Sequence, residues 1–284
     1  MDQTIINLYD EFVHGGVERR EFLERLSKLA GGAAAAMAAL PLLENNYALA
    51  QIVPETDSRL VTSKAEYEAV GGKVSGYLAR LKGGGKRPAV IVIHENRGLN
   101  PHIQDVARQV AVEGFLAFAV DALSPLGGTP ADESQATKMI GSLNPAETVE
   151  RLAAAVAFLA RHVESTGKVG VVGFCWGGGM VNRLAAAGTS LNAGVAYYGA
   201  QLPADQVPKI TAPLLLHYGS LDERINAGIP AYEAALKANK KVYEVYMYEG
   251  ANHAFNNNTN AARYNKEAAA LAWSRTIQFF KKYL

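Results

Sequence analysis

Apolar runs of strand length recur along the chain from residue 89 onward and alternate with segments of helical spacing. The apolar runs are 89–94, 116–120, 169–174, 193–198, 214–218 and 242–248. The segments of helical spacing are 101–113, 148–161, 178–187, 229–238 and 261–282. Strands that are apolar throughout are typical of a parallel sheet whose two faces are covered by helices. The pattern therefore predicts an α/β fold with a doubly wound, mostly parallel sheet of about eight strands.

A β-hairpin is predicted ahead of this alternation. Residues 60–67 and 73–80 have strand character and flank Gly71-Gly72, a dipeptide typical of a hairpin turn. No linker, repeat or low-complexity tract interrupts residues 51–284, so we expect a single domain there. The longest stretch between sheet elements, 122–145, is too short for a large cap domain.

The first fifty residues have a different pattern. Arg19-Arg20 precedes Phe22-Leu23, the run 29–43 is rich in alanine and free of charge, and residues 48–50 form an Ala-Leu-Ala sequence. These features are typical of a twin-arginine (Tat) export signal, and the apolar run is too short to span a bilayer as a helix. Residues 1–50 are therefore predicted to direct the protein to the periplasm.

The alternative for residues 1–50 is a helical extension that stays on the domain, which would leave the protein in the cytoplasm. Its apolar face would consist of Ile5, Ile6, Leu8, Tyr9, Phe12 and Val13.

Composition and charge narrow the choice of partners. The net charge is +1, whereas nucleic acids and anionic membrane surfaces favour a clustered basic excess, so we expect neither nucleic-acid binding nor stable membrane insertion. Cys175 is the single cysteine, which excludes an intramolecular disulfide and a thiolate zinc cluster. No His-Glu-x-x-His or similar spacing occurs, so neither a catalytic metal nor a cofactor is expected. The oligomeric state is left open.

The residues Gly173-Phe174-Cys175-Trp176-Gly177 carry the sharpest chemical signal. They form the pattern Gly-x-nucleophile-x-Gly between an apolar strand and a helix of small residues, which is the context of a nucleophile elbow. Glycine is needed on both sides because the turn is strained and larger side chains would collide with the neighbouring strand and helix. The turn would place the Cys175 thiol near a helix N-terminus, which favours the thiolate. The alternative for a lone cysteine is a buried structural thiol.

An acid and a histidine follow this elbow in the order that the α/β-hydrolase fold requires. Asp222 follows the strand 214–218, and His253 lies in the loop after the strand 242–248. Both loops lie at the carboxyl edge of the predicted sheet, so Cys175, Asp222 and His253 are predicted to form a catalytic triad on an α/β-hydrolase fold. Each has a plainer alternative, because an aspartate after a strand often caps a turn and a loop histidine is often a surface residue.

The loop after the first parallel strand supplies the other candidates. This position normally provides one amide of an oxyanion hole, so the backbone N–H groups of Asn96 and Trp176 are the predicted pair. Arg97 and Tyr198 are candidate substrate-binding residues. Glu95 would face the reacting centre, or it would be an exposed acid paired with Arg97.

The remaining histidines are weaker candidates. His94 and His102 flank the same loop and are candidates for lining the pocket, whereas His217 lies within an apolar strand and is expected in the core. His14 lies in the leader and His162 near a helix end, and neither receives a role.

Four groups of residues resemble the dienelactone hydrolase (carboxymethylenebutenolidase) family over roughly residues 60–284. They are Glu-Asn-Arg-Gly-Leu-Asn at 95–100, Gly-Phe-Cys-Trp-Gly-Gly at 173–178, Asp222, and His-Ala-Phe at 253–255. The resemblance implies hydrolysis of a small ester or lactone through the triad Cys175, His253 and Asp222, with an acyl-enzyme intermediate. It also implies a role for Glu95, because in that family the matching glutamate contacts the resting thiol and helps to generate the thiolate when substrate binds.

One departure from the family concerns the substrate. Lactone-cleaving members carry an arginine a few residues after the catalytic histidine, and Asn257 stands in its place here. Dienelactone as the substrate is therefore left open. A thioesterase or a small-peptide hydrolase would use the same triad, and a non-catalytic binding or thiol-sensing module would keep the fold without needing Asp222 and His253. A thiol oxidoreductase is disfavoured because no resolving cysteine is present.

Overall fold

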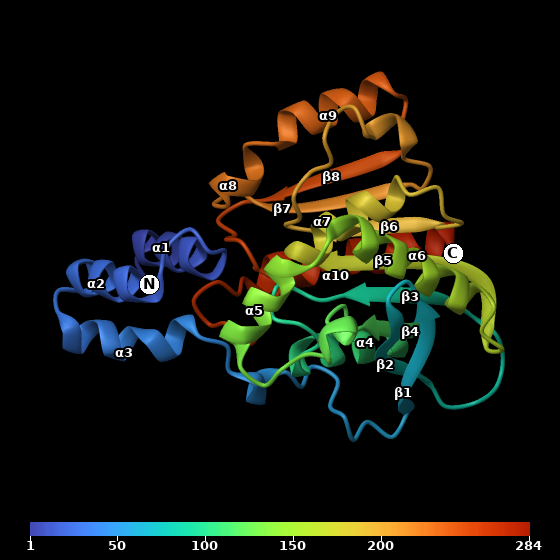
Figure 1. Cartoon of the computed structure of the whole chain (residues 1–284), viewed down its shortest axis with the longest axis horizontal. Helices are drawn as coiled ribbons and strands as arrows, with labels where there is room; N and C mark the ends of the chain where they lie inside the picture. The colour runs from blue at the N-terminus through green and yellow to red at the C-terminus, as the bar shows by residue number, and fades with distance from the viewer.

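Eight strands form a single sheet in the order β1-β2-β4-β3-β5-β6-β7-β8 in the computed structural model, which describes all 284 residues. The strands are β1 (Leu60–Ala69), β2 (Gly72–Leu81), β3 (Arg87–Ile93), β4 (Leu116–Val120), β5 (Ser165–Phe174), β6 (Ala193–Tyr197), β7 (Leu214–Gly219) and β8 (Tyr243–Tyr248). β1 and β2 form the predicted antiparallel hairpin, β2 is also antiparallel to β4, and all other neighbours are parallel. The predicted sheet is confirmed (Figure 1).

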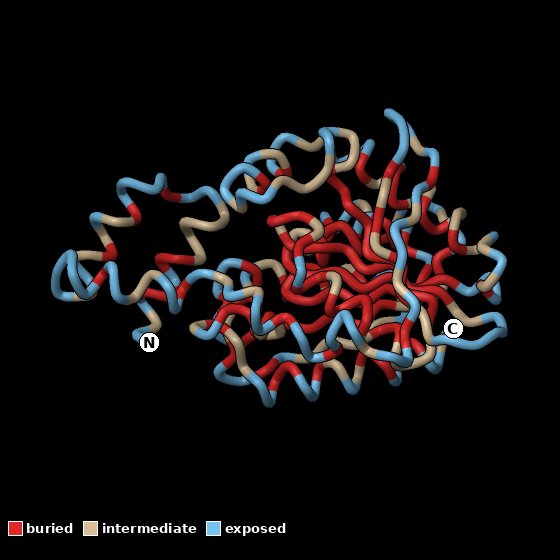
Figure 2. Tube along the Cα trace, turned by 90° about the horizontal axis from the view of Figure 1, so that it is seen from below, coloured by how far each residue is buried: buried red, intermediate tan, exposed pale blue.

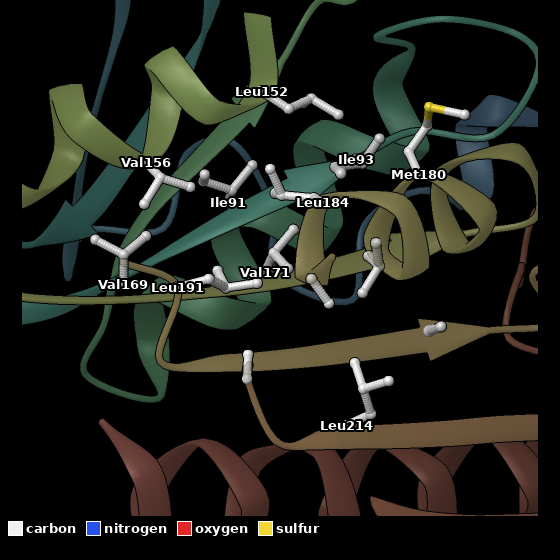
Figure 3. Packing of buried hydrophobic residues seen from close by; sticks show 14 of the residues in the cluster. Ile91, Ile93, Leu152, Val156, Val169, Val171, Met180, Leu184, Leu191 and Leu214 are labelled. Carbon is white, nitrogen blue, oxygen red and sulfur yellow. The ribbon is translucent and has the colours of Figure 1, made fainter. Parts of the chain in front are cut away.

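Helices cover both faces of this sheet. They are α4 (Pro101–Val112), α5 (Glu133–Ser142), α6 (Pro145–Ala160), α7 (Trp176–Ala185), α8 (Glu223–Asn226), α9 (Ile229–Ala238) and α10 (Lys266–Tyr283). Buried residues of α6, α7 and α9 join one apolar cluster with the sheet, and those of α4 and α10 join a second cluster on the opposite face. Figure 3 shows the packing of α6 and α7 against β3 and β5 through Leu152, Val156, Met180, Leu184, Ile91, Ile93 and Val171. Each such side chain contributes roughly 1.5–3 kcal/mol through its removal from water.

The predicted start of the last helix is wrong. The last helix begins at Lys266 instead of residue 261, because Asn265 caps it by accepting a hydrogen bond from the Ala268 N–H. The preceding residues form turns, and among them Asn260 donates a hydrogen bond to the carbonyl of Leu43. The stretch 122–145 contains α5 and no large cap domain, as expected from its length.

The first fifty residues form three helices beside the sheet: α1 (Gln3–Val13), α2 (Arg19–Ala30) and α3 (Ala33–Leu43). Their apolar faces meet in a small cluster of their own, made of Ile5, Leu8, Tyr9, Val17, Phe22, Leu26, Ala36 and Leu43. Figure 1 shows these helices projecting past the ends of the strands near α8, and Figure 2 shows the chain around the N-terminus extending away from the buried core. No single helix has the length and apolar character to cross a membrane, and α2 passes that test only together with residues 33–49, across a bend of 110°.

Candidate active site

Cys175 lies at the sharp turn between β5 and α7. Its backbone has φ 53° and ψ −114°, a conformation that residues other than glycine rarely adopt. A Cβ on Gly173 would meet the Gly177 carbonyl oxygen at 2.2 Å, and one on Gly177 would meet the carbonyl oxygens of Ile93 and His94 at 2.5 Å. Both glycines are therefore required by close backbone contacts, which draw the start of α7 against the loop after β3.

His253 and Asp222 form a buried pair beside this turn. Nδ1 of His253 lies 2.5 Å from Oδ2 of Asp222, and both side chains are almost fully buried. Asp222 follows β7 and also accepts a hydrogen bond from the Ile225 N–H at the start of α8. With Nδ1 engaged, Nε2 of His253 is the free nitrogen, and it has no hydrogen-bond partner. A ring nitrogen of His253 and Sγ of Cys175 belong to a group of atoms that all lie within 4.8 Å of one another.

Two imidazoles favour the ionised form of the Cys175 thiol. Burial by itself would raise the pKa of the thiol, but the positive charges of His253 and His14 outweigh burial and lower that pKa to about 6. Burial would also lower the pKa of His253, but Asp222, Asp10 and Cys175 raise it well above its ordinary value. A thiolate beside an imidazolium is therefore favoured at neutral pH.

The backbone N–H groups of Asn96 and Trp176 donate to no acceptor in the protein. Trp176 begins α7, so its amide is one of the unpaired donors at a helix N-terminus. The close approach of Gly177 to the backbone of His94 brings this end of the helix against the loop that carries Asn96. Free amides of this kind are the donors that an oxyanion developing near Cys175 would need.

Glu95 is buried, and its carboxylate is not bound to the thiol. It accepts hydrogen bonds from Nδ2 of Asn257 at 2.9 Å and from the Tyr198 hydroxyl at 3.4 Å. Sγ of Cys175 is instead contacted by Nε2 of His14 at 3.3 Å. The expectation that Glu95 contacts the resting thiol is therefore not met in this structure.

Arg97 does not pair with Glu95 either, so the interpretation of an exposed Glu95–Arg97 pair is wrong. The Arg97 guanidinium is buried, lies 3.1 Å from Glu133 of α5 and donates to the Tyr9 hydroxyl of α1. Tyr198, the other candidate for substrate binding, is fully buried at φ 40°, with its ring 5.0 Å from that of His253.

His94, His102 and His217 have structural roles. His94 is buried, accepts a hydrogen bond from the Ala122 N–H and stacks on Trp176. His102 is buried within α4, and burial lowers the pKa of both His94 and His102. His217 lies in the core, as predicted, bonded to Tyr248 and Thr276.

The helix α1 covers the entrance to this site, which the sequence analysis did not predict. Asp10 lies 3.3 Å from Arg224 and 3.6 Å from Arg263, and the Val13 carbonyl accepts a hydrogen bond from the side chain of Asn96. A cavity of about 260 Å³ remains between α1 and the loops that carry His253. It is lined by Ile6, Asn7, Asp10, Glu11, Leu221, Asp222, Glu223, Arg224, Asn252, His253 and Arg263.

His14, Asp10, Arg224 and Arg263 are thus the site residues that the sequence analysis missed. The apolar spacing of residues 5–13 indicates a helix that needs a partner surface. Nothing in that spacing identifies the partner, because Asp10 and Arg224 are 214 positions apart.

Comparison with known proteins agrees with this geometry. A family model described as the dienelactone hydrolase family matches residues 74–284, and a second, described as YqhI-like, matches residues 1–32. A relative from Escherichia coli O157:H7, named "Putative carboxymethylenebutenolidase", is 30% identical over 248 residues, which cover 82% of this chain and 91% of the relative. A relative from Bradyrhizobium sp, named "Probable 2-oxo-3-(5-oxofuran-2-ylidene)propanoate lactonase", is 33% identical over 224 residues, which cover 73% and 89%.

A solved structure matches over most of the domain. The crystal structure of a dienelactone hydrolase-like promiscuous phosphotriesterase from metagenomic libraries has a TM-score of 0.73 and 26% identity, covering 80% of this chain and 99% of that chain. The sheet and the elbow define an enzyme of the α/β-hydrolase class. Within that class the chain belongs to the dienelactone hydrolase family, and it is a carboxylic ester hydrolase of that type. The N-terminal match covers α1, and His14 lies within it.

Proposed function

We propose that this protein hydrolyses a small, neutral ester or lactone with Cys175 as the nucleophile, His253 as the general base and Asp222 as the group that orients His253. The observation that carries the proposal is the convergence of three features at Cys175. The thiol lies on a strained elbow, the His253–Asp222 pair is buried beside it, and two unpaired amides belong to the start of α7 and to the loop packed against it. A structural cysteine has no need of these features together.

The reaction would proceed in two halves. The Cys175 thiolate attacks the carbonyl carbon, and the oxyanion that forms accepts hydrogen bonds from the amides of Asn96 and Trp176. Collapse of the tetrahedral intermediate breaks the ester C–O bond, and His253 gives its proton to the departing alkoxide, leaving a thioester on Cys175. His253 then takes a proton from water, which attacks the thioester and releases the carboxylic acid and the thiolate. In a lactone the alcohol and the acid remain in one molecule.

The charges around the cavity favour a substrate without a carboxylate. Four carboxylates line the cavity, from Asp10, Glu11, Asp222 and Glu223, together with the guanidinium groups of Arg224 and Arg263 and the His253 imidazolium. Both arginines already face Asp10. Asn257, where lactone-cleaving members have an arginine, adds no positive charge. Because His253 is likewise paired with Asp222, an anionic acyl group would find no cation here that is free of a carboxylate partner.

The test is a hydrolysis screen with matched pairs of substrates. Short-chain aryl esters, enol lactones and thioesters are each offered as a neutral compound and as its carboxylate analogue. We expect the neutral member of each pair to have the higher kcat/KM. Cys175→Ala should reduce kcat by several orders of magnitude, and iodoacetamide should inactivate the enzyme unless substrate is present. Near-normal turnover by Cys175→Ala would overturn the nucleophile, whereas faster hydrolysis of the carboxylates would overturn only the substrate class.

A further inference from the structure

Two histidines from opposite ends of the chain point at one cysteine. Nε2 of His14, just after α1, lies 3.3 Å from Sγ of Cys175. His253 comes from the loop after β8, and a ring nitrogen of each histidine and Sγ of Cys175 all lie within 4.8 Å of one another. In a tetrahedral zinc site with ordinary bond lengths, a nitrogen and a sulfur ligand are about 3.6 Å apart. The three side chains are therefore close enough for small rotations to bring them onto one ion.

Both imidazoles are held in the orientation that metal ligation requires. Nδ1 of His253 is bound by the Asp222 carboxylate at 2.5 Å, and Nδ1 of His14 lies 2.7 Å from the Asp10 carbonyl oxygen. An acceptor on Nδ1 fixes the tautomer that leaves Nε2 free for a metal. His253 is buried, and its Nε2 has no hydrogen-bond partner. The site therefore has its ligand atoms and the outer groups that orient them.

From this geometry we propose that Cys175, His14 and His253 form a binding site for a borderline-soft divalent cation of the Zn²⁺ class. One thiolate and two imidazoles suit Zn²⁺ or Co²⁺ and are poor ligands for Mg²⁺ or Ca²⁺. Water would fill the fourth position, as in sites with three protein ligands. The Arg224 guanidinium, 3.2 Å from Nε2 of His14, has to turn away, and its side chain is 45% exposed to solvent.

The bound ion would suppress hydrolysis and hold α1 on the site. It occupies the thiolate and Nε2 of His253, which are the nucleophile and the base of the proposed function, so this consequence rests on that function. It also ties His14, and with it α1, to Cys175. The binding itself does not depend on the hydrolytic role, because it needs only the three side chains.

The experiment uses the full-length, untagged, reduced protein after removal of metals by chelator. Co²⁺ titration is expected to give a thiolate-to-cobalt charge-transfer band and the intense visible bands of tetrahedral Co²⁺, saturating at one ion per chain.

Zn²⁺ affinity is measured by competition with a chromophoric chelator. We expect His14→Gln to weaken Zn²⁺ binding by about 100-fold or more, since even loss of an outer-shell partner costs 10–100-fold. The control His162→Gln removes a histidine that lies outside the site and should bind as the unchanged protein does.

The following outcomes decide the proposal. Equal Zn²⁺ affinity in His14→Gln and His162→Gln, or no charge-transfer band, would overturn it. If His14→Gln is unfolded by circular dichroism, X-ray absorption of the zinc-loaded unchanged protein decides instead, because the proposal requires one sulfur and two imidazole ligands. Inhibition of ester hydrolysis by Zn²⁺ is also compared between His14→Gln and His162→Gln, each against its own metal-free rate. Loss of Co²⁺ binding in Cys175→Ser together with normal ester hydrolysis would support the metal site while refuting the proposed nucleophile.

Discussion

The side-chain amide of Asn257 donates a hydrogen bond to the carboxylate of Glu95 at 2.9 Å, across 162 positions of the chain. Both residues are buried, and the Tyr198 hydroxyl is the second donor to this carboxylate. A neutral amide thus faces the Glu95 carboxylate. Two neutral donors, the Asn257 amide and the Tyr198 hydroxyl, therefore hold the Glu95 carboxylate. The Tyr198 ring in turn packs on that of His253.

We expect Glu95→Gln to lower kcat by about tenfold or more while KM changes little. The substitution keeps the shape of the side chain but removes the charge next to Tyr198 and sets an amide against the Asn257 amide. The measurement is steady-state kinetics on the best ester from the screen. Glu164→Gln is the matched control, because Glu164 pairs with Arg80 away from the site and such pairs contribute about 0–1 kcal/mol to stability. An unchanged kcat in Glu95→Gln would show that Glu95 does not contribute to turnover.

The alkylation of Cys175 should depend on pH in the slightly acidic range. His253 and His14 lower the pKa of the thiol to about 6, so the reactive thiolate is present above that pH and is lost as the pH falls through it. We expect the iodoacetamide rate, measured in chelator, to rise with pH around a midpoint near 6. His14→Gln removes one of the two positive charges and should move the midpoint upward. A midpoint near that of an ordinary thiol, about 8.5, in the unchanged protein would contradict this electrostatic account.

Asp10→Asn should loosen α1 from the loops that follow β7 and β8. The carboxylate lies 3.3 Å from Arg224 and 3.6 Å from Arg263, and the Arg263 side chain is almost fully buried. Removing one partner of a buried charge pair leaves the other uncompensated, so we expect local stability to fall by about 1.5–3 kcal/mol. Hydrogen exchange of α1 is the measurement, and faster exchange confined to α1 is the expected result.

Glu11→Gln is the control for this change because it alters the neighbouring residue of the same helix. Glu11 pairs with Arg25 of α2 on the surface, where both side chains are more than 40% exposed. That pair should contribute no more than about 1 kcal/mol. Equal exchange rates in Asp10→Asn and Glu11→Gln would show that the pairs with Arg224 and Arg263 do not hold α1 in place.

Local sequence patterns were sufficient to predict most of the domain. The Gly71-Gly72 turn lies between β1 and β2 as predicted, and the apolar runs 116–120 and 214–218 fall within β4 and β7. These elements are fixed by residues that are close in the sequence and by the regular spacing of buried apolar positions. A single sequence displays both.

The contacts of the N-terminal helices could not be predicted in the same way. The apolar face that includes Ile5, Leu8 and Tyr9 is visible in the sequence, and the structure buries all three. The position of His14 on Cys175, 161 residues away, depends on where the helix docks. Such a long-range contact has no local pattern, and a histidine near a twin arginine resembles part of a leader.

The role of residues 1–50 decides between two fates of the protein. Ile52 and Val53 donate backbone hydrogen bonds to the Asp105 carboxylate on α4, so a chain that begins near Gln51 keeps its attachment to the domain. Export through Arg19-Arg20 with cleavage after Ala50 would therefore leave an intact hydrolase without α1.

We expect the native host to hold a periplasmic form that begins near Gln51, and Arg19→Lys with Arg20→Lys to retain the protein inside the cell. N-terminal sequencing of each cell fraction is the measurement. Arg25→Lys on the same helix is the control and should not alter export. Protein that begins at Met1 and occurs only in the cytosol would instead assign residues 1–50 a permanent place on the active site.

In that second case, deletion of residues 1–50 should lower the melting temperature and expose apolar surface around Ala262, which packs on the N-terminal cluster. The deletion also removes His14, so it should abolish the cobalt charge-transfer band while leaving Cys175 and His253 in place. If the mature periplasmic form hydrolyses esters without inhibition by Zn²⁺ and the full-length form is inhibited, then α1 acts on the enzyme only before export. Equal Zn²⁺ inhibition of the two forms would separate the metal effect from α1 and contradict the role given to His14.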